Sequence, residues 1–171
     1  FFANRFLFVK FIWKNENPGF AKANNEELKL AKLEKVLFLN PDTILPEDGL
    51  EKCLHFFQQQ ENTGALGVKM IDGAGNFLPE SKRGFPSAFA SFCKMSGLTS
   101  MFPKSKLFAR YYLGHLQENQ NNEIDVVSGA FMMVDKKVLD AVGSFDEDYF
   151  MYAEDIDLSY RIQNAGYKNF Y

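Results

Sequence analysis

Apolar residues in this chain fall into short unbroken runs and into helical repeats. The runs predict strands at 6–13, 36–39, 66–71, 124–127, 130–134 and 167–171. Apolar positions three or four residues apart predict helices at 20–33, 47–59, 135–142 and 154–165. Strands that alternate with helices indicate an α/β fold, a mixed and mostly parallel sheet flanked by helices. The fully apolar run 36–39 is expected in the middle of that sheet. The pattern over 86–116 is ambiguous, and helical pieces are expected there.

The length of 171 residues suits a single domain. Both chain ends, Phe1 and Tyr171, fall in or beside predicted strands. The sequence therefore predicts one partial domain, 1–171, incomplete at both ends, and exposed strand edges that favour self-association.

Charge and cysteine content narrow the function classes. The chain has 19 basic and 22 acidic side chains, a net charge of -3, so a nucleic-acid partner is not expected. Cys53 and Cys93 lie far apart and indicate no disulfide framework, which fits a reducing cytoplasmic compartment. No apolar run reaches the roughly 18 residues of a membrane span.

Asn40-Pro41-Asp42 follows the apolar run 36–39 directly. Ligands of open α/β sheets bind outside the carboxyl ends of strands. A carboxylate there can hold a hard divalent cation that bridges phosphate oxygens. A plain turn explains the same three residues, because Asn, Pro and Asp are all common in turns.

Glu154 and Asp155 open the predicted helix 154–165. One of the pair can serve as a general base if burial or like charge shifts its pKa. Acids are also favoured at helix N-termini by the macrodipole alone. A calcium loop starting at Asp146 is excluded, since the required Gly is missing from its sixth position.

Two glycine-containing segments are further candidates. Gly19 precedes a helix, where backbone can approach a ligand, although a helix cap explains it as well. Gly129 interrupts a strand pattern, which indicates a bulge or a close approach by another group. Lys82 and Arg83 are expected to be solvated in a loop, with a phosphate contact as the alternative.

Taken in order, the segments NPGFAKANNEELKLAK, VLFLNPDT, DGAGN, VVSGAFMMV and GSFDEDYFMYAEDIDLSYRIQNAGYK resemble family 2 glycosyltransferases of bacteria. The similarity covers nearly the whole chain and is greatest to the rhamnosyltransferase-type branch. It implies a GT-A fold, an inverting reaction, a UDP- or dTDP-linked sugar donor and Mg²⁺ or Mn²⁺. The acceptor implied is a hydroxyl of a glycan or lipid-linked glycan in the synthesis of cell-surface polysaccharide.

The resemblance also implies roles for individual residues. Asp155 is expected to be the catalytic base, with Glu154 as its catalytic neighbour, and Asp42 the metal ligand. Donor contacts are expected at Gly19, Asn24, Asn40, Asp42, Ser128, Gly129 and Ala130. Asn40 stands where the family motif has its first acid, which loosens that contact. Family members carry further nucleotide-binding strands before this region and a His after it, so residues 1–171 alone are expected to show weak transfer or none.

Two other functions fit parts of the sequence. A non-catalytic fragment could bind only sugar nucleotide or another subunit. A nucleotidyltransferase shares the sheet and the metal, but it should carry a Gly-rich basic loop near its start, and none is visible. The expected location is the cytoplasm, and peripheral attachment to the inner face of the cytoplasmic membrane stays open.

Overall fold

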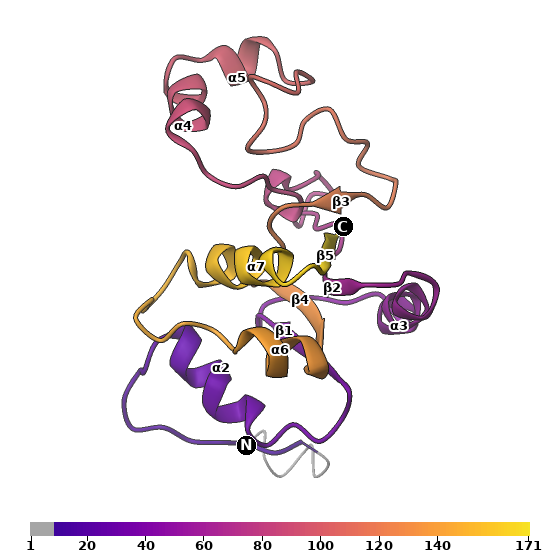
Figure 1. Cartoon of the computed structure of the whole chain (residues 1–171), viewed down its shortest axis with the longest axis vertical. Helices are drawn as coiled ribbons and strands as arrows, with labels where there is room; N and C mark the ends of the chain where they lie inside the picture. Colours follow the sequence, from indigo (N-terminus) through magenta and orange to yellow (C-terminus); the bar gives the residue numbers. More distant parts are fainter. Residues whose placement is uncertain (1–8) are drawn as a thin grey trace.

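The computed structural model describes residues 9–171, and all structural statements below concern that part of the chain. Its elements are α2 (Phe20–Leu28), β1 (Lys35–Leu39), α3 (Gly49–Gln59), β2 (Thr63–Leu66), η1 (Pro79–Ser81), α4 (Ala88–Met95), α5 (Leu98–Met101), β3 (Glu123–Ile124), β4 (Phe131–Asp135), α6 (Lys136–Val142), α7 (Glu154–Asn164) and β5 (Lys168–Phe170) (Figure 1).

The five strands form one sheet in the order β1-β4-β2-β5-β3. β4 runs antiparallel to both neighbours, with Leu37 opposite Met133 and Ala65 opposite Val134. Only β2 and β5 pair in parallel, and β3 is antiparallel to β5. The prediction of a mostly parallel sheet is therefore wrong. Apolar runs report burial on both faces of a strand, and they carry no information about its direction.

Two apolar cores lie on opposite faces of the sheet, because successive side chains of a strand point to opposite sides. Along β4, Met132 and Val134 enter the core shared with α2, α6 and α7. Phe131 and Met133 enter the smaller core covered by α3. β4 is buried at every position. The predicted arrangement of helices on both faces is confirmed.

Several predicted boundaries are shifted in the structure. Of the strand expected at 66–71, only Leu66 lies in β2 (Thr63–Leu66), and one further backbone hydrogen bond follows it, from the Gly67 amide to the Phe170 carbonyl at 2.8 Å. β1 lies at an edge of the described sheet and not in its middle. Of the strand expected at 6–13, residues 9–13 form none, and 6–8 lie outside the described residues. The first helix ends at Leu28, five residues early.

The segment between η1 and β3 leaves the sheet altogether. It contains α4 and α5, which pack against each other and lie at one end of the molecule, beyond β3 (Figure 1). This part was expected to contain helical pieces, and it does. None of the helices within 9–171 is both long and apolar enough to cross a bilayer.

Candidate functional site

The turn at 128–130 joins three parts of the fold at one end of β1. The Asn40 amide donates to the Ala130 carbonyl at 3.0 Å, just after β1 ends. The Gly129 amide donates to Oδ2 of Asp155, in the first turn of α7, at 3.1 Å. Ser128 Oγ accepts from the Ala130 amide at 3.3 Å, which shapes the turn itself. Five of the residues proposed from sequence therefore occupy one small region.

Asp155 receives a second donor that was not expected. Arg83 Nη2 lies 2.5 Å from the same Oδ2 atom, and the two side chains are only 12% and 13% exposed. The Arg83 backbone is fixed by its carbonyl, which accepts from the Val126 amide at 2.9 Å. Burial lowers the pKa of the Arg83 guanidinium, but the Asp155 carboxylate raises it further, so that the net shift is upward.

The expectation that Lys82 and Arg83 are solvated is wrong for both residues. Lys82 is 3% exposed, and its ammonium donates to the carbonyls of Leu113 and Leu116 at 3.0 Å each. Burial lowers the pKa of Lys82. Adjacent basic residues in a polar stretch are usually at the surface, and the local sequence around Lys82 and Arg83 carries no signal that these two are buried.

Glu154 differs sharply from Asp155 in its surroundings. It is 7% exposed, and its Oε2 is buried without a hydrogen-bond partner among the described residues. Burial raises the pKa of Glu154, and the neighbouring charge of Asp155 adds to the increase. The two adjacent carboxyls therefore have different surroundings: Glu154 is buried without a hydrogen-bond partner among the described residues, and Asp155 is paired with Arg83.

The start of α2 packs against the segment that leads into α7. Gly19 has φ 85°, and a Cβ there would lie 2.6 Å from the Phe150 carbonyl, so only glycine fits. The Phe20 amide donates to that carbonyl at 3.1 Å. The Phe20 ring lies 3.5 Å from where a Cβ on Gly129 would be. Gly19 is thus brought close to the turn at 128–130.

Asn24, a proposed donor contact, and its neighbour Asn25 make different contacts in the structure. The Asn24 amide donates to the Phe20 carbonyl of its own helix at 2.9 Å. Asn25 is buried, donates to the Phe145 carbonyl at 2.7 Å and accepts from the Phe145 amide at 3.1 Å. It also donates to Glu147 at 3.1 Å. Asn25 therefore positions the segment before α7, and sequence alone did not single it out.

Asp42 is exposed, in the turn closed by the Thr43 amide and the Asn40 carbonyl at 3.2 Å. Within residues 9–171, no three His, Cys, Asp or Glu side chains come together as metal ligands. Mg²⁺ commonly uses one or two carboxylates and takes its other ligands from phosphate and water. An exposed Asp42 at the end of a strand fits that kind of site.

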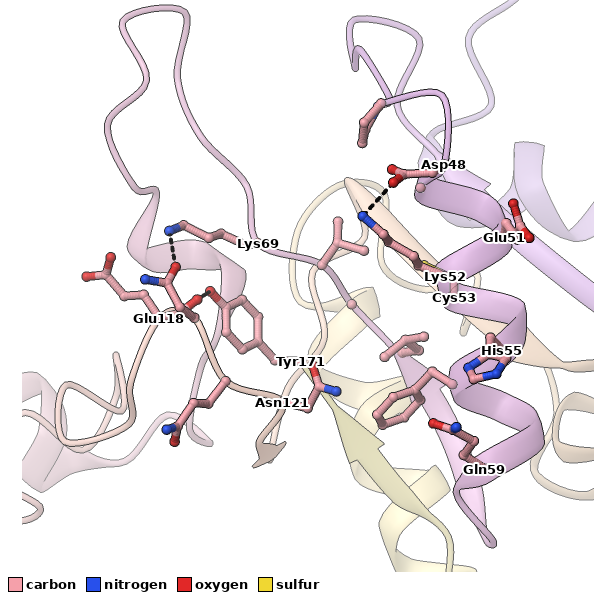
Figure 2. Close-up of a pocket in the computed structure, with 18 residues that line it drawn as sticks. Asp48, Glu51, Lys52, Cys53, His55, Gln59, Lys69, Glu118, Asn121 and Tyr171 are labelled. Atoms are coloured by element: carbon pink, nitrogen blue, oxygen red, sulfur yellow. Dashed lines mark hydrogen bonds and ion pairs between the residues drawn. The ribbon is translucent and has the colours of Figure 1, made fainter.

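A hollow lies elsewhere, on the side of the sheet covered by α3. It has a volume of about 920 Å³, and Figure 2 shows α3 along one side and the loop before β3 along the other. Its lining includes the polar side chains of Asp48, Lys52, His55, Gln59, Lys69 and Asn121. Burial raises the pKa of Tyr171, at its floor, to about 12. None of the site residues proposed from sequence lines it.

Comparison with known proteins identifies the family of the chain. The profile of the family described as Glycosyl transferase family 2 matches residues 2–143. The chain is 28% identical over 162 residues to the rhamnosyltransferase WbbL of Escherichia coli K12, covering 90% of this chain and 57% of the relative.

Two further relatives show the same partial coverage. Identity is 29% over 136 residues to an N-acetylglucosaminyl-diphospho-decaprenol L-rhamnosyltransferase of Mycobacterium tuberculosis, covering 80% of this chain and 43% of the relative. Identity is 24% over 157 residues to the low-salt glycan biosynthesis hexosyltransferase Agl10 of Haloferax volcanii, covering 90% of this chain and 46% of the relative. The chain thus spans about half the length of the curated relatives it matches.

Proposed function

Because the chain belongs to glycosyltransferase family 2, we propose that it provides the central part of an inverting sugar transferase. The donor is a UDP- or dTDP-linked sugar, and the acceptor is a hydroxyl of a glycan or lipid-linked glycan. The relatives described above, two rhamnosyltransferases and a hexosyltransferase of glycan synthesis, support this class of reaction.

One observation carries the proposal: the hydrogen bonds Asn40–Ala130 and Gly129–Asp155 bring the end of β1 and the start of α7 to one turn. A donor diphosphate beside Asn40 and Asp42 and an acceptor beside Asp155 would then face each other across the turn. This is the arrangement that a direct displacement requires, since the nucleophile must approach opposite to the leaving group.

In the reaction, the acceptor oxygen forms a bond to the anomeric carbon while the bond from that carbon to the diphosphate oxygen breaks. The electron pair of the broken bond stays on the nucleoside diphosphate, and the acceptor proton passes to Asp155. A single displacement inverts the anomeric centre. A positioned base of this kind contributes roughly 10²–10⁴-fold.

The carboxylate geometry suits proton acceptance. Both donors, Arg83 and the Gly129 amide, bind Oδ2. No side chain or backbone amide of residues 9–171 donates to Oδ1, which leaves that oxygen for a substrate hydroxyl. Arg83 acts in this proposal as a positioning residue, because it fixes the carboxylate and does not touch the reacting atoms.

The second chemical requirement is stabilisation of the leaving diphosphate. Mg²⁺ or Mn²⁺ held at Asp42 would supply positive charge to the departing phosphate oxygens. The Asn40 position adds no carboxylate, so Asp42 is the residue of this segment on which ion binding depends.

Calorimetric titration of UDP and dTDP, with and without Mn²⁺, tests the donor site. We expect Mn²⁺-dependent binding that Asp42→Ala abolishes and that the exposed control substitution Glu61→Ala leaves unchanged. Asp155→Asn should keep the nucleotide affinity within about twofold, since the base contacts the acceptor. A donor site at Asp42 would be refuted if the folded protein bound neither nucleotide. It would also be refuted if Asp42→Ala and the control Glu61→Ala lost nucleotide affinity equally.

A further inference from the structure

The segment from 84 to 116, here called the α4–α5 lobe, leaves the sheet and lies at one end of the molecule (Figure 1). Lys82, which lies just outside the lobe, anchors it by donating to the carbonyls of Leu113 and Leu116. Within the lobe, the Gly84 amide donates to the Tyr111 carbonyl at 2.7 Å. Thr99 Oγ1 donates to the Phe108 carbonyl at 2.8 Å and ties its two halves together. The lobe is therefore a fixed structure rather than a loose loop.

Its helix α4 has its large apolar side chains on the outside. Phe89, Phe92 and Met95 are 44%, 59% and 89% exposed, while the small Ala90 and Cys93 face inward. The three exposed residues are spaced three apart, so they share one face of the helix. A surface helix of a globular protein normally shows the opposite arrangement, with large apolar residues turned to the core.

Further large apolar side chains of the lobe are exposed after α4. Met101 is 70% exposed, Phe102 47% and Leu107 55%. Clustered apolar side chains on an exposed surface mark sites of contact with a protein, a ligand or a membrane. The charge of the same lobe distinguishes among these.

Residues 81–117 contain six Lys or Arg and no Asp or Glu, whereas the rest of the chain has 13 basic and 22 acidic side chains. Lys82 is buried and Arg83 is paired with Asp155, which leaves four basic residues on the surface of the lobe. These are Lys94, Lys104, Lys106 and Arg110, all exposed. The lobe is thus the cationic end of an otherwise acidic molecule.

From these observations we infer that the α4–α5 lobe docks on the surface of an anionic lipid bilayer. The exposed Phe and Met side chains enter the boundary between headgroups and acyl chains, and the basic residues meet the lipid phosphates. The acidic remainder of the chain is repelled by the same surface, which orients the lobe toward it. A second copy of the chain is a poorer occupant, because face-to-face packing would bring the cationic groups of two lobes together.

This inference does not depend on the proposed transfer reaction, since docking needs neither donor nor metal. The position of the lobe in the chain nevertheless links membrane docking to the transfer reaction. Arg83, which binds Asp155, is directly followed by the lobe. Docking would therefore hold the Asp155 region at a defined orientation to the bilayer.

Co-sedimentation of the 171-residue chain with vesicles tests the inference. We expect binding to vesicles of phosphatidylcholine and phosphatidylglycerol, weakened by added NaCl, and much less binding to vesicles of phosphatidylcholine alone. Lys104→Gln with Lys106→Gln should weaken the partition coefficient by roughly 25-fold, at about 1 kcal/mol for each basic residue. Phe92→Ser with Met95→Ser should weaken it by about tenfold or more.

Matched variants on the rest of the surface distinguish vesicle binding by this lobe from nonspecific binding by other exposed basic or apolar residues. Lys29→Gln with Lys32→Gln removes two exposed basic residues, and Leu33→Ser with Ile44→Ser removes apolar residues that are 77% and 94% exposed. Both controls should bind vesicles within about twofold of the parent chain, and circular dichroism should show all variants folded.

Three results would overturn the inference: no binding of the parent chain to the anionic vesicles, an equal loss in the control variants, or a lobe used for self-association. Self-association would appear in analytical ultracentrifugation as a dimer that the double substitution Phe92→Ser with Met95→Ser dissociates. In that case the parent chain would not bind vesicles.

Discussion

The Arg83 guanidinium lies 2.5 Å from the Asp155 carboxylate, although 72 positions separate the two residues in the chain. Both side chains are largely buried, so the pair is protected from the screening that weakens surface ion pairs. The contact connects the segment that leads to the α4–α5 lobe with the first turn of α7. It also decides which oxygen of Asp155 stays available, because both donors occupy Oδ2.

Removing Arg83 should leave a buried carboxylate without its cation. We expect Arg83→Met to lower the free energy of unfolding by about 3 kcal/mol, as is typical when one partner of a buried pair is lost. Combining it with Asp155→Asn should recover much of that loss, since no charge is then left unpaired. Urea unfolding of the two single variants and the double variant measures the coupling.

Arg110→Met is the control for that cycle, because Arg110 is exposed and in the same part of the chain. It should change the free energy of unfolding by less than about 0.5 kcal/mol. Additive effects of Arg83→Met and Asp155→Asn would contradict the structural pairing.

Glu154 should make the protein less stable as pH rises. Burial raises its pKa above the ordinary value of 4.5, so the folded state binds the proton more tightly than the unfolded state. Its favourable contribution is complete below pH 4.5 and is lost as pH rises through the higher folded pKa. Glu154→Gln, which cannot ionise, should therefore gain stability relative to the parent chain at pH 8 compared with pH 4, as followed by urea unfolding. A difference that does not change with pH would contradict this.

The sequence predicted the elements of the fold better than their arrangement. Apolar periodicity located α3, α6 and α7 closely, and the run at 130–134 became β4. Strand direction was wrong, because the buried run of β4 is covered on both faces whichever way it runs. The edge position of β1 likewise depends on which strands pair, and a hydrophobic pattern does not encode pairing partners.

Contacts between distant parts of the chain were also missed when site residues were predicted. Gly19, Asn40, Gly129 and Asp155 were proposed from motifs, and the structure brings their segments together, while their roles remain predictions. Arg83 was assigned to solvent because its partner is distant in the sequence. A sequence motif reports only on residues that are close together in the chain. An ion pair between distant residues therefore cannot be predicted from a motif.

Asn25 and Asn24 offer a direct test of which asparagine supports the fold. Asn25→Ala removes a buried donor and acceptor that satisfy both backbone groups of Phe145. We expect a loss of about 2–3 kcal/mol, since those groups would be left buried and unpaired. Asn24→Ala removes one bond within α2 and improves helix propensity, so its effect should stay within about 0.5 kcal/mol. Thermal unfolding compares the two, and equal effects would contradict the structure.

The stability of the chain should fall when Gly64 is replaced by alanine and stay unchanged when Gly129 is. A Cβ on Gly64 would lie 2.2 Å from Ile162 Cγ2, inside the core between β2 and α7, so Gly64→Ala should cost about 1–3 kcal/mol by overpacking. A Cβ on Gly129 would meet Phe20 and Asp155 at ordinary contact distances of 3.5 and 3.6 Å, so Gly129→Ala should keep the stability of the parent chain. If substrate approaches the backbone at Gly129, as the proposed reaction requires, the added methyl group should still raise the KM of the enzyme that contains this domain, by about tenfold for a displacement costing roughly 1.4 kcal/mol. Steady-state kinetics beside urea unfolding separates the two properties. Unchanged kinetics in a stable Gly129→Ala variant would place the substrate away from this turn.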